Sequence, residues 1–265
     1  MRCAGGSDVS NAVDIFNQCP AGCLFSNLTC SQCAAGSYNG LSGQSSCIPC
    51  PAGTSNPSLG RSSPAACSPC ANGTYSGLGQ SSCSDCPSGS YCPDPARSPV
   101  ICPAGSYCPA KSVSFVKCDL GYLCSQEGLS QQSPCPSGSY CPDPARSPVI
   151  CPAGSFCAAK SVTPAPCDKG TYSGSGQSSC SDCPSGSYCP YQCGSPVICP
   201  AGSYCPAKRG TFVKCDLGYL CSQEGLSQQL LCPSGHYCPS SVKDVPCPAG
   251  TFSSATGAGS GFSIV

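Results

Sequence analysis

Cysteine is the residue of this chain whose type and spacing could do chemistry, and it accounts for 32 of the 265 residues. Thiols spaced Cys-x-x-Cys can form half of a zinc site or can belong to disulfides. Five pairs have this spacing: Cys30/Cys33, Cys47/Cys50, Cys67/Cys70, Cys83/Cys86 and Cys180/Cys183. Most later cysteines are separated by five residues, which is not a usual zinc spacing, and His236 is the only histidine. Disulfides are therefore the main interpretation, with a zinc-binding array as an alternative.

The cysteines belong to a repeated motif that begins Cys-x-x-Gly and usually carries an aromatic residue five places after the cysteine. Fourteen such units follow one another at intervals of about sixteen residues, and each is named here by its first cysteine. The units begin at Cys33, Cys50, Cys70, Cys86, Cys102, Cys118, Cys135, Cys151, Cys167, Cys183, Cys199, Cys215, Cys232 and Cys247. A short fixed period predicts an array of small structural units, each in contact mainly with its neighbours.

The units have two cysteine patterns. In the first style the second cysteine comes late, and we predict that it bonds to the first because this closes the tract that carries the turn. In the second style it follows six residues after the first, and we predict that the unit closes on itself; staggered pairing, such as Cys92 with Cys102, is the alternative. The predicted first-style bonds are Cys33–Cys47, Cys50–Cys67, Cys70–Cys83 and Cys167–Cys180. The predicted second-style bonds are Cys86–Cys92, Cys102–Cys108, Cys118–Cys124, Cys135–Cys141, Cys151–Cys157, Cys183–Cys189, Cys199–Cys205, Cys215–Cys221 and Cys232–Cys238.

The composition predicts a disulfide scaffold in an oxidising compartment. Leu, Ile, Val and Phe make up about 14% of the chain, below the roughly 20% that ordinary cores need, whereas cysteine at about 12% exceeds the roughly 8–10% typical of disulfide scaffolds. Covalent bonds must therefore replace a core, and the chain is expected to be extracellular. It has no apolar run long enough to span a membrane. No signal peptide follows Met1, so we expect a piece of a longer chain.

The predicted fold is an elongated array of small disulfide-rich repeats, made mostly of coil and turns with short β-strands and almost no helix. Glycine and proline, 31 and 29 residues, interrupt every unit and prevent helices. Only residues 8–17 could hold a short helix or strand. The expected segments are an irregular 1–32, Cys-x-x-Cys-linked repeats over 33–85, Cys-x5-Cys repeats over 86–166, a single first-style repeat over 167–182, duplicated Cys-x5-Cys repeats over 183–247, and a Gly/Ser-rich tail with a truncated repeat over 248–265. Within this tail, residues 253–265 are expected to be mobile. Residues 117–132 recur unchanged from Lys214, which indicates segmental duplication.

The sequence gives little support for nucleic-acid binding or for catalysis. The formal net charge is zero with 9% charged residues, so no basic stripe for nucleic acid is present. No catalytic motif occurs, and no cofactor is expected. Asn27 and Asn72 begin N-glycosylation sequons, so covalent glycans are predicted. The repeated aromatic residues are expected to pack over a disulfide or a proline; the alternative is a ladder of rings that binds glycan or a partner chain.

The stretches Cys70 to Cys86 and Cys167 to Cys183 carry a pattern that suggests a family. They read Cys-x-x-Gly-Thr-Tyr-Ser-Gly-x-Gly-Gln-Ser-Ser-Cys-Ser-Asp-Cys and resemble the ephrin-receptor-like cysteine repeat; they are also similar to tumour-necrosis-factor-receptor and EGF-like modules. Over about 33–250 the array resembles protist and algal surface proteins, including mastigoneme (flagellar hair) glycoproteins. The resemblance implies a structural extracellular glycoprotein that self-associates into a filament or cell-surface coat. The alternative is a receptor or adhesin ectodomain that binds a protein or glycan.

Overall fold

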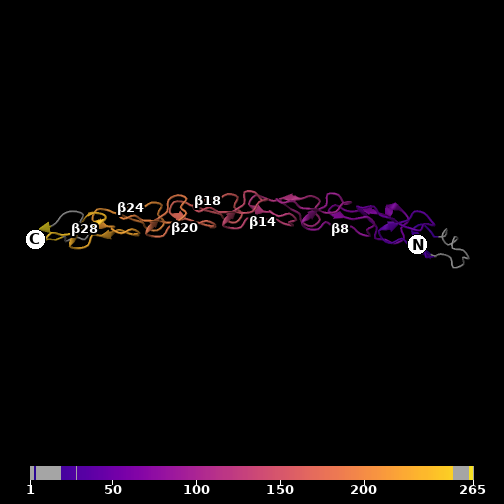
Figure 1. The fold of residues 1–265 in the computed structure, drawn as a ribbon, viewed down its shortest axis with the longest axis horizontal. Helices are drawn as coiled ribbons and strands as arrows, with labels where there is room; N and C mark the ends of the chain where they lie inside the picture. Colours follow the sequence, from indigo (N-terminus) through magenta and orange to yellow (C-terminus); the bar gives the residue numbers. More distant parts are fainter. Residues whose placement is uncertain (1–2, 4–18, 28, 253–262, 265) are drawn as a thin grey trace. The chain divides into compact units, whose positions relative to one another are not determined.

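The computed structural model describes residues 3, 19–27, 29–252 and 263–264, and its strands follow one another along the chain (Figure 1). These residues form two-stranded antiparallel sheets joined by turns. They contain no α-helix, and the 3-10 helix η1 (Pro64–Ala66) is three residues long. The predicted class of short strands and disulfide-stapled repeats is thus confirmed. The stretch 8–17, where a short helix or strand was allowed for, lies outside the described residues.

Each sheet is a hairpin built in the same way, and the Cys86 unit illustrates it. Strand β9 (Ser90–Tyr91) pairs with β10 (Val100–Ile101), so that Tyr91 lies opposite Val100. A tight turn precedes β9, with the Ser90 N–H donating to the Pro87 carbonyl at 3.1 Å. Gly89 holds the third position of this turn with φ +81°, which fits a type II turn and favours glycine there. The Cys-x-x-Gly motif therefore starts a hairpin in every unit.

The hairpins follow in chain order. The first half of the chain has β1 (Cys23–Ser26) with β2 (Thr29–Gln32), β3 (Ser37–Tyr38) with β4 (Ile48–Pro49), β5 (Thr54–Ser55) with β6 (Ser68–Pro69), β7 (Thr74–Tyr75) with β8 (Ser84–Asp85), β9 with β10, β11 (Ser106–Tyr107) with β12 (Val116–Lys117), and β13 (Tyr122–Leu123) with β14 (Ser133–Pro134). The second half has β15 (Ser139–Tyr140) with β16 (Val149–Ile150), β17 (Ser155–Phe156) with β18 (Ala165–Pro166), β19 (Thr171–Tyr172) with β20 (Ser181–Asp182), β21 (Ser187–Tyr188) with β22 (Val197–Ile198), β23 (Ser203–Tyr204) with β24 (Val213–Lys214), β25 (Tyr219–Leu220) with β26 (Leu230–Leu231), β27 (His236–Ser240) with β28 (Lys243–Pro246), and β29 (Thr251–Phe252) with β30 (Ser263–Ile264).

Near each end of the chain, the described residues include a hairpin that the sequence did not predict. Residues 1–32 were expected to be irregular, but β1 and β2 pair over four residues each, from Cys23 opposite Gln32 to Ser26 opposite Thr29. At the other end, β29 pairs with β30, and β30 lies in the stretch 253–265 that was expected to be mobile. Residues 253–262 lie outside the described part. Single-residue propensity does not reveal such pairings because each depends on a partner strand.

The chain divides into two compact groups, which are described separately. The N-terminal group comprises residues 1–119, 124–133 and 144–146, and the C-terminal group comprises residues 120–123, 134–143 and 147–265. Within each group the same backbone bonds link successive units. In the N-terminal group, Gly89 N donates to Cys108 O at 2.8 Å and Lys111 N donates to Cys86 O at 2.9 Å. In the C-terminal group, Gly186 N donates to Cys205 O and Lys208 N to Cys183 O at 2.8 and 2.9 Å.

The core of the described chain is sulfur. Every buried apolar residue there is a cysteine, and no Leu, Ile, Val or Phe is buried. The aliphatic side chains lie outside instead, and Leu217 is 83% exposed. A chain with so few large apolar residues cannot enclose a conventional core, so half-cystines fill the interior.

Candidate functional site

The disulfides are the chemical feature that the sequence placed at the centre of each unit. The first-style units close long loops with sequence separations of 13 to 17 residues. These bonds are Cys33–Cys47, Cys50–Cys67, Cys70–Cys83 and Cys167–Cys180. They join the cysteines that the sequence analysis paired. Two further bonds, Cys3–Cys23 and Cys19–Cys30, close the N-terminal segment.

The second-style units close on themselves across six residues. Cys92 bonds to Cys86 and Cys102 bonds to Cys108, so the structure does not contain the staggered Cys92–Cys102 alternative. The remaining bonds of this style are Cys118–Cys124, Cys135–Cys141, Cys151–Cys157, Cys183–Cys189, Cys199–Cys205, Cys215–Cys221 and Cys232–Cys238. Each second-style unit therefore carries its own disulfide bond.

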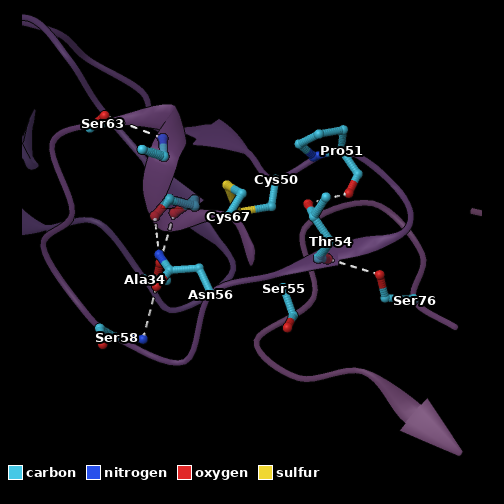
Figure 2. The surroundings of a disulfide bond; sticks show 12 residues. Ala34, Cys50, Pro51, Thr54, Ser55, Asn56, Ser58, Ser63, Cys67 and Ser76 are labelled. Carbon is cyan, nitrogen blue, oxygen red and sulfur yellow. Dashed lines mark hydrogen bonds between the residues drawn. A yellow bond between two sulfur atoms is a disulfide. The ribbon is translucent and has the colours of Figure 1, made fainter. Parts of the chain in front are cut away.

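The residue six places after a unit's first cysteine, called position six here, distinguishes the two styles. In second-style units it is the second half-cystine. In first-style units it is a buried polar residue whose side chain donates to a carbonyl of the preceding unit: Asn39 to Cys23, Asn56 to Ser37, Ser76 to Thr54 and Ser173 to Ser155, at 2.7–3.0 Å. Figure 2 shows the Ser76–Thr54 bond beside the Cys50–Cys67 disulfide. Sequence reasoning missed this role, although the shared spacing could have revealed it.

Position six also makes the same backbone bond in both styles. Its carbonyl accepts the N–H of the turn glycine of the preceding unit, as when Gly36 donates to Asn56 at 2.7 Å and Gly89 donates to Cys108 at 2.8 Å. The backbone contact between neighbours is therefore kept, while the side chain supplies either a hydrogen bond to the neighbour or a disulfide within the unit.

The turn glycines have a second reason to be glycine, which is close approach to another repeat. A Cβ atom on Gly89 would lie 2.2 Å from the carbonyl oxygen of Gly128, which belongs to the unit after next. In the C-terminal group, a Cβ atom on Gly186 would lie 2.4 Å from the Gly225 oxygen. Gly77, by contrast, would meet nothing within 4 Å. The sequence could not show this packing, because it depends on a residue of another repeat.

The five Cys-x-x-Cys pairs do not present thiolates for a metal. In each pair both cysteines are bonded to partners outside the pair; Cys47, for example, bonds to Cys33, and Cys50 bonds to Cys67. Zinc binding requires free thiolates, so this arrangement gives the zinc alternative no ligands at these positions. Within the described ranges, no group of three or more His, Cys, Asp or Glu side chains is placed to hold a metal ion.

Two cysteines have no disulfide partner, Cys193 and Cys247. Cys247 is half-buried, whereas Cys193 is only 5% exposed. Cys193 corresponds to Ala96, 97 residues earlier, because the duplicated cassette reads CPYQCGS where the first copy reads CPDPARS. Its Sγ donates to the Ser195 carbonyl at 2.8 Å. Sequence reasoning did not single out this thiol, although the break in the duplication marked it.

The repeated aromatic residues lie half-buried and make several kinds of contact. Tyr172 packs against the buried cysteine cluster that contains the Cys183–Cys189 disulfide, as expected for a ring over a disulfide. Tyr91 instead meets Phe115 edge-on at 5.7 Å, and the duplicated Tyr188 meets Phe212 at 5.6 Å. Ring pairs of this geometry stabilise by about 0.5–1.5 kcal/mol beyond area burial. These contacts hold neighbouring units together.

Exposed aliphatic side chains recur along the described chain, and charged residues are few. The outer strands of three hairpins carry Val-Ile pairs, and their isoleucines, Ile101, Ile150 and Ile198, are each more than 60% exposed. Ion pairs are exposed; Lys111 Nζ lies 3.3 Å from Asp85 and Lys208 Nζ lies 2.9 Å from Asp182. Such pairs contribute little to stability, so the surface offers repeated apolar contacts rather than a charged site.

Both sequons lie on exposed turns. Asn27 sits at the turn between β1 and β2 with φ 50°, and Asn72 sits in the turn before β7. The sequon threonines donate locally, Thr29 to Ser26 O at 2.9 Å and Thr74 to Ala71 O at 2.7 Å. Exposure leaves both asparagines accessible, and their glycosylation stays a prediction.

The comparison with known proteins identifies one segment. Residues 25–67 match the family model described as tyrosine-protein kinase ephrin type A/B receptor-like. This is the family that the sequence pattern suggested, matched just before the Cys70–Cys86 stretch. No curated protein matches the chain. The described residues contain no helix with the length and hydropathy of a membrane span.

The chain therefore has an ephrin-receptor-like cysteine-rich domain near its N-terminus, and many small disulfide-bonded repeats follow it. Disulfide density of this kind is typical of extracellular proteins.

Proposed function

We propose that this protein is a structural extracellular glycoprotein, whose repeats form a rod that contributes to a filament, such as a flagellar hair, or to a cell-surface coat. The observation that supports this most is the link between neighbouring units, which is made by backbone atoms. The bond from Gly89 N to Cys108 O recurs 97 residues later from Gly186 N to Cys205 O at the same length, 2.8 Å. A contact that needs only a glycine turn and the backbone carbonyl of position six in the next unit can be repeated as often as the gene is extended.

The surface favours self-association as the function of such an array. The formal net charge is zero, so electrostatic repulsion does not oppose contact between copies. Exposed isoleucines recur at Ile101, Ile150 and Ile198, so a weak apolar contact is offered several times per chain. Repeated weak contacts add through multivalency. Glycans on Asn27 and Asn72 would limit the surface on which copies can meet.

Electron microscopy and sedimentation of the protein purified from its native source test this proposal. We expect laterally or helically assembled glycoprotein fibres, and an increase in sedimentation coefficient with concentration. Treatment with an N-glycosidase should lower the apparent mass of the protein. A discrete unglycosylated monomer that forms no fibre at any concentration would overturn the proposal.

A receptor or adhesin ectodomain is the second candidate, because residues 25–67 match an ephrin-receptor-like model. In that case a protein or glycan ligand would bind the N-terminal domain, and the later repeats would serve as a stalk. Binding of the full chain to glycan and extracellular-protein arrays tests it. Saturable binding that is lost when residues 25–67 are replaced by a later pair of units, in a protein that stays monomeric, would favour this candidate over the structural one.

A further inference from the structure

The Cys183 unit differs from the other second-style units by containing a third cysteine. Cys193 packs with Cys183 and Cys189 in one buried cluster, although those two are bonded to each other. The corresponding positions in the earlier Cys86 and Cys135 units are Ala96 and Ala145. A free thiol is thus held against a disulfide at a place where sister units have a methyl group.

Neighbouring residues hold Cys193 at this position. Its carbonyl accepts the Ser173 N–H at 3.0 Å, and its backbone forms a parallel bridge with Tyr172. Its Sγ donates to the Ser195 carbonyl at 2.8 Å. Because Cys193 is only 5% exposed and packs against Cys183 and Cys189, the sulfurs of that disulfide are the reaction partners that its surroundings offer, and burial restricts access for soluble thiols and oxidants.

We propose that Cys193 is an alternative partner for Cys183, so that this unit exchanges between a Cys183–Cys189 and a Cys183–Cys193 disulfide. The Cys193 thiolate attacks the sulfur of Cys183 and forms the Cys183–Cys193 bond while the Cys183–Cys189 bond breaks. Cys189 leaves as a thiolate and takes up the proton that Cys193 gave up. One disulfide and one thiol stand on each side of the step, so no oxidant or reductant is needed.

The spacing of disulfides in the other units indicates why Cys193 would bond to Cys183 and not to Cys189. A unit's first cysteine bonds at a separation of six residues in the second style and 13 to 17 in the first. A Cys183–Cys193 bond would span ten residues, within this range. A Cys189–Cys193 bond would span four, shorter than any disulfide in the chain. The exchange converts the unit from its second-style closure toward the longer first-style closure.

The exchange would change how this unit contacts its neighbours. Cys189 donates its N–H to Arg209 O at 2.8 Å and accepts the Gly170 N–H at 2.9 Å. In the exchanged form, the residue that makes these hydrogen bonds, Cys189, is no longer covalently bonded to Cys183. The Cys183 unit can therefore free Cys189 from its disulfide while it still keeps one disulfide bond. This inference does not depend on the proposed function.

A pair of variants tests the alternative pairing in the full chain, produced in an oxidising compartment. Cys189→Ala removes the present partner of Cys183, and Cys92→Ala does the same to Cys86 in the copy that has alanine at position 96. Thiols are counted by alkylation in denaturant without reduction. The unaltered chain should give two thiols, Cys193 and Cys247. We expect one in Cys189→Ala, because Cys183 pairs with Cys193, and three in Cys92→Ala. Three thiols in both variants would overturn the proposal.

Peptide mapping of the unaltered chain tests the exchange itself. The chain is incubated at mildly alkaline pH, which favours the thiolate, then acidified to stop exchange and digested with pepsin. We expect a Cys183–Cys193 peptide beside the Cys183–Cys189 peptide. Cys193→Ala, which restores the residue of the sister units, should give only the latter. If the unaltered chain also gives only the Cys183–Cys189 peptide, the proposal is wrong.

Discussion

The two styles of unit differ in the residue at position six, although both form the same backbone contact with the preceding unit. In first-style units such as the Cys50 unit, position six is a buried polar residue, and Asn56 donates from its side chain to Ser37 O of the preceding unit at 3.0 Å. In second-style units such as the Cys102 unit, position six is Cys108, bonded within the unit. Both styles keep the bond from the preceding turn glycine to the position-six carbonyl. The backbone contact therefore defines the array, and the side chain at position six can vary.

The largest effect should come from breaking what both styles share, the turn glycine. In Gly89→Ala, the added Cβ would lie 2.2 Å from the Gly128 oxygen, in a residue with φ +81°. The left-handed backbone alone costs about 1–2 kcal/mol, and the clash with a backbone oxygen should raise the loss of local stability to about 3–4 kcal/mol. Native-state hydrogen exchange of the Cys86 and Cys102 units measures it.

Gly77→Ala is the matched control, because a Cβ atom there meets nothing within 4 Å and the residue does not have a positive φ. Its exchange protection should change by less than about 0.5 kcal/mol. Equal losses in the two variants would show that the close approach of Gly128 does not hold the repeats.

The next largest loss of stability should come from removing a disulfide, and it should differ between the two styles of unit. Replacing both cysteines of Cys70–Cys83, which closes a separation of 13 residues, should cost about 3 kcal/mol by loop-closure entropy. Replacing both cysteines of Cys102–Cys108, with a separation of six, should cost about 2 kcal/mol. Double alanine variants avoid stray thiols, and proteolysis rates under native conditions compare the local stabilities. A larger loss from the shorter loop would mean that contacts in the folded unit, rather than loop entropy, set the contribution of the staple.

The sequence predicted the repeat period and the near absence of helix, because the spacing of cysteine, glycine and proline constrains these features. It offered pairings within the units from Cys33 to Cys238, but none for Cys3–Cys23 or Cys19–Cys30. A half-cystine six residues from another, between proline-rich tracts, has few other partners within reach. The sequence did not predict the β1–β2 hairpin, because strand propensity does not show which residues pair. It also did not predict the packing of Gly89 against Gly128 or the buried Asn56, because each depends on a residue in another unit. The burial of Cys193 was missed for the same reason, since it follows from packing against Tyr172 and a disulfide.

A smaller effect should come from position six of a first-style unit. Asn56 is 1% exposed, and in Asn56→Ala the carbonyl of the half-buried Ser37 would lose its side-chain donor. An unsatisfied buried acceptor costs about 1–3 kcal/mol. Asn56→Ser is the control, because serine fills the same position as Ser76 and Ser173 and donates there. Hydrogen exchange of the Cys33 and Cys50 units should show a loss in the alanine variant and partial recovery with serine. If the two variants are equally destabilised, the side-chain bond between neighbours is not what stabilises this position.

The smallest effect should come from the ion pairs between units. Lys111 and Asp85 are more than half exposed, as are Lys208 and Asp182 in the duplicated copy. Water and salt screen charges at such exposure, so Lys111→Gln should change stability by less than about 0.5 kcal/mol, and the difference should vanish at high salt. Lys208→Gln is the parallel test in the C-terminal group. Hydrogen exchange at two salt concentrations measures both. A salt-independent loss above 1 kcal/mol in either variant would show that the lysine stem, rather than its charge, packs on another unit, and that side chains help backbone atoms to set the contact between repeats.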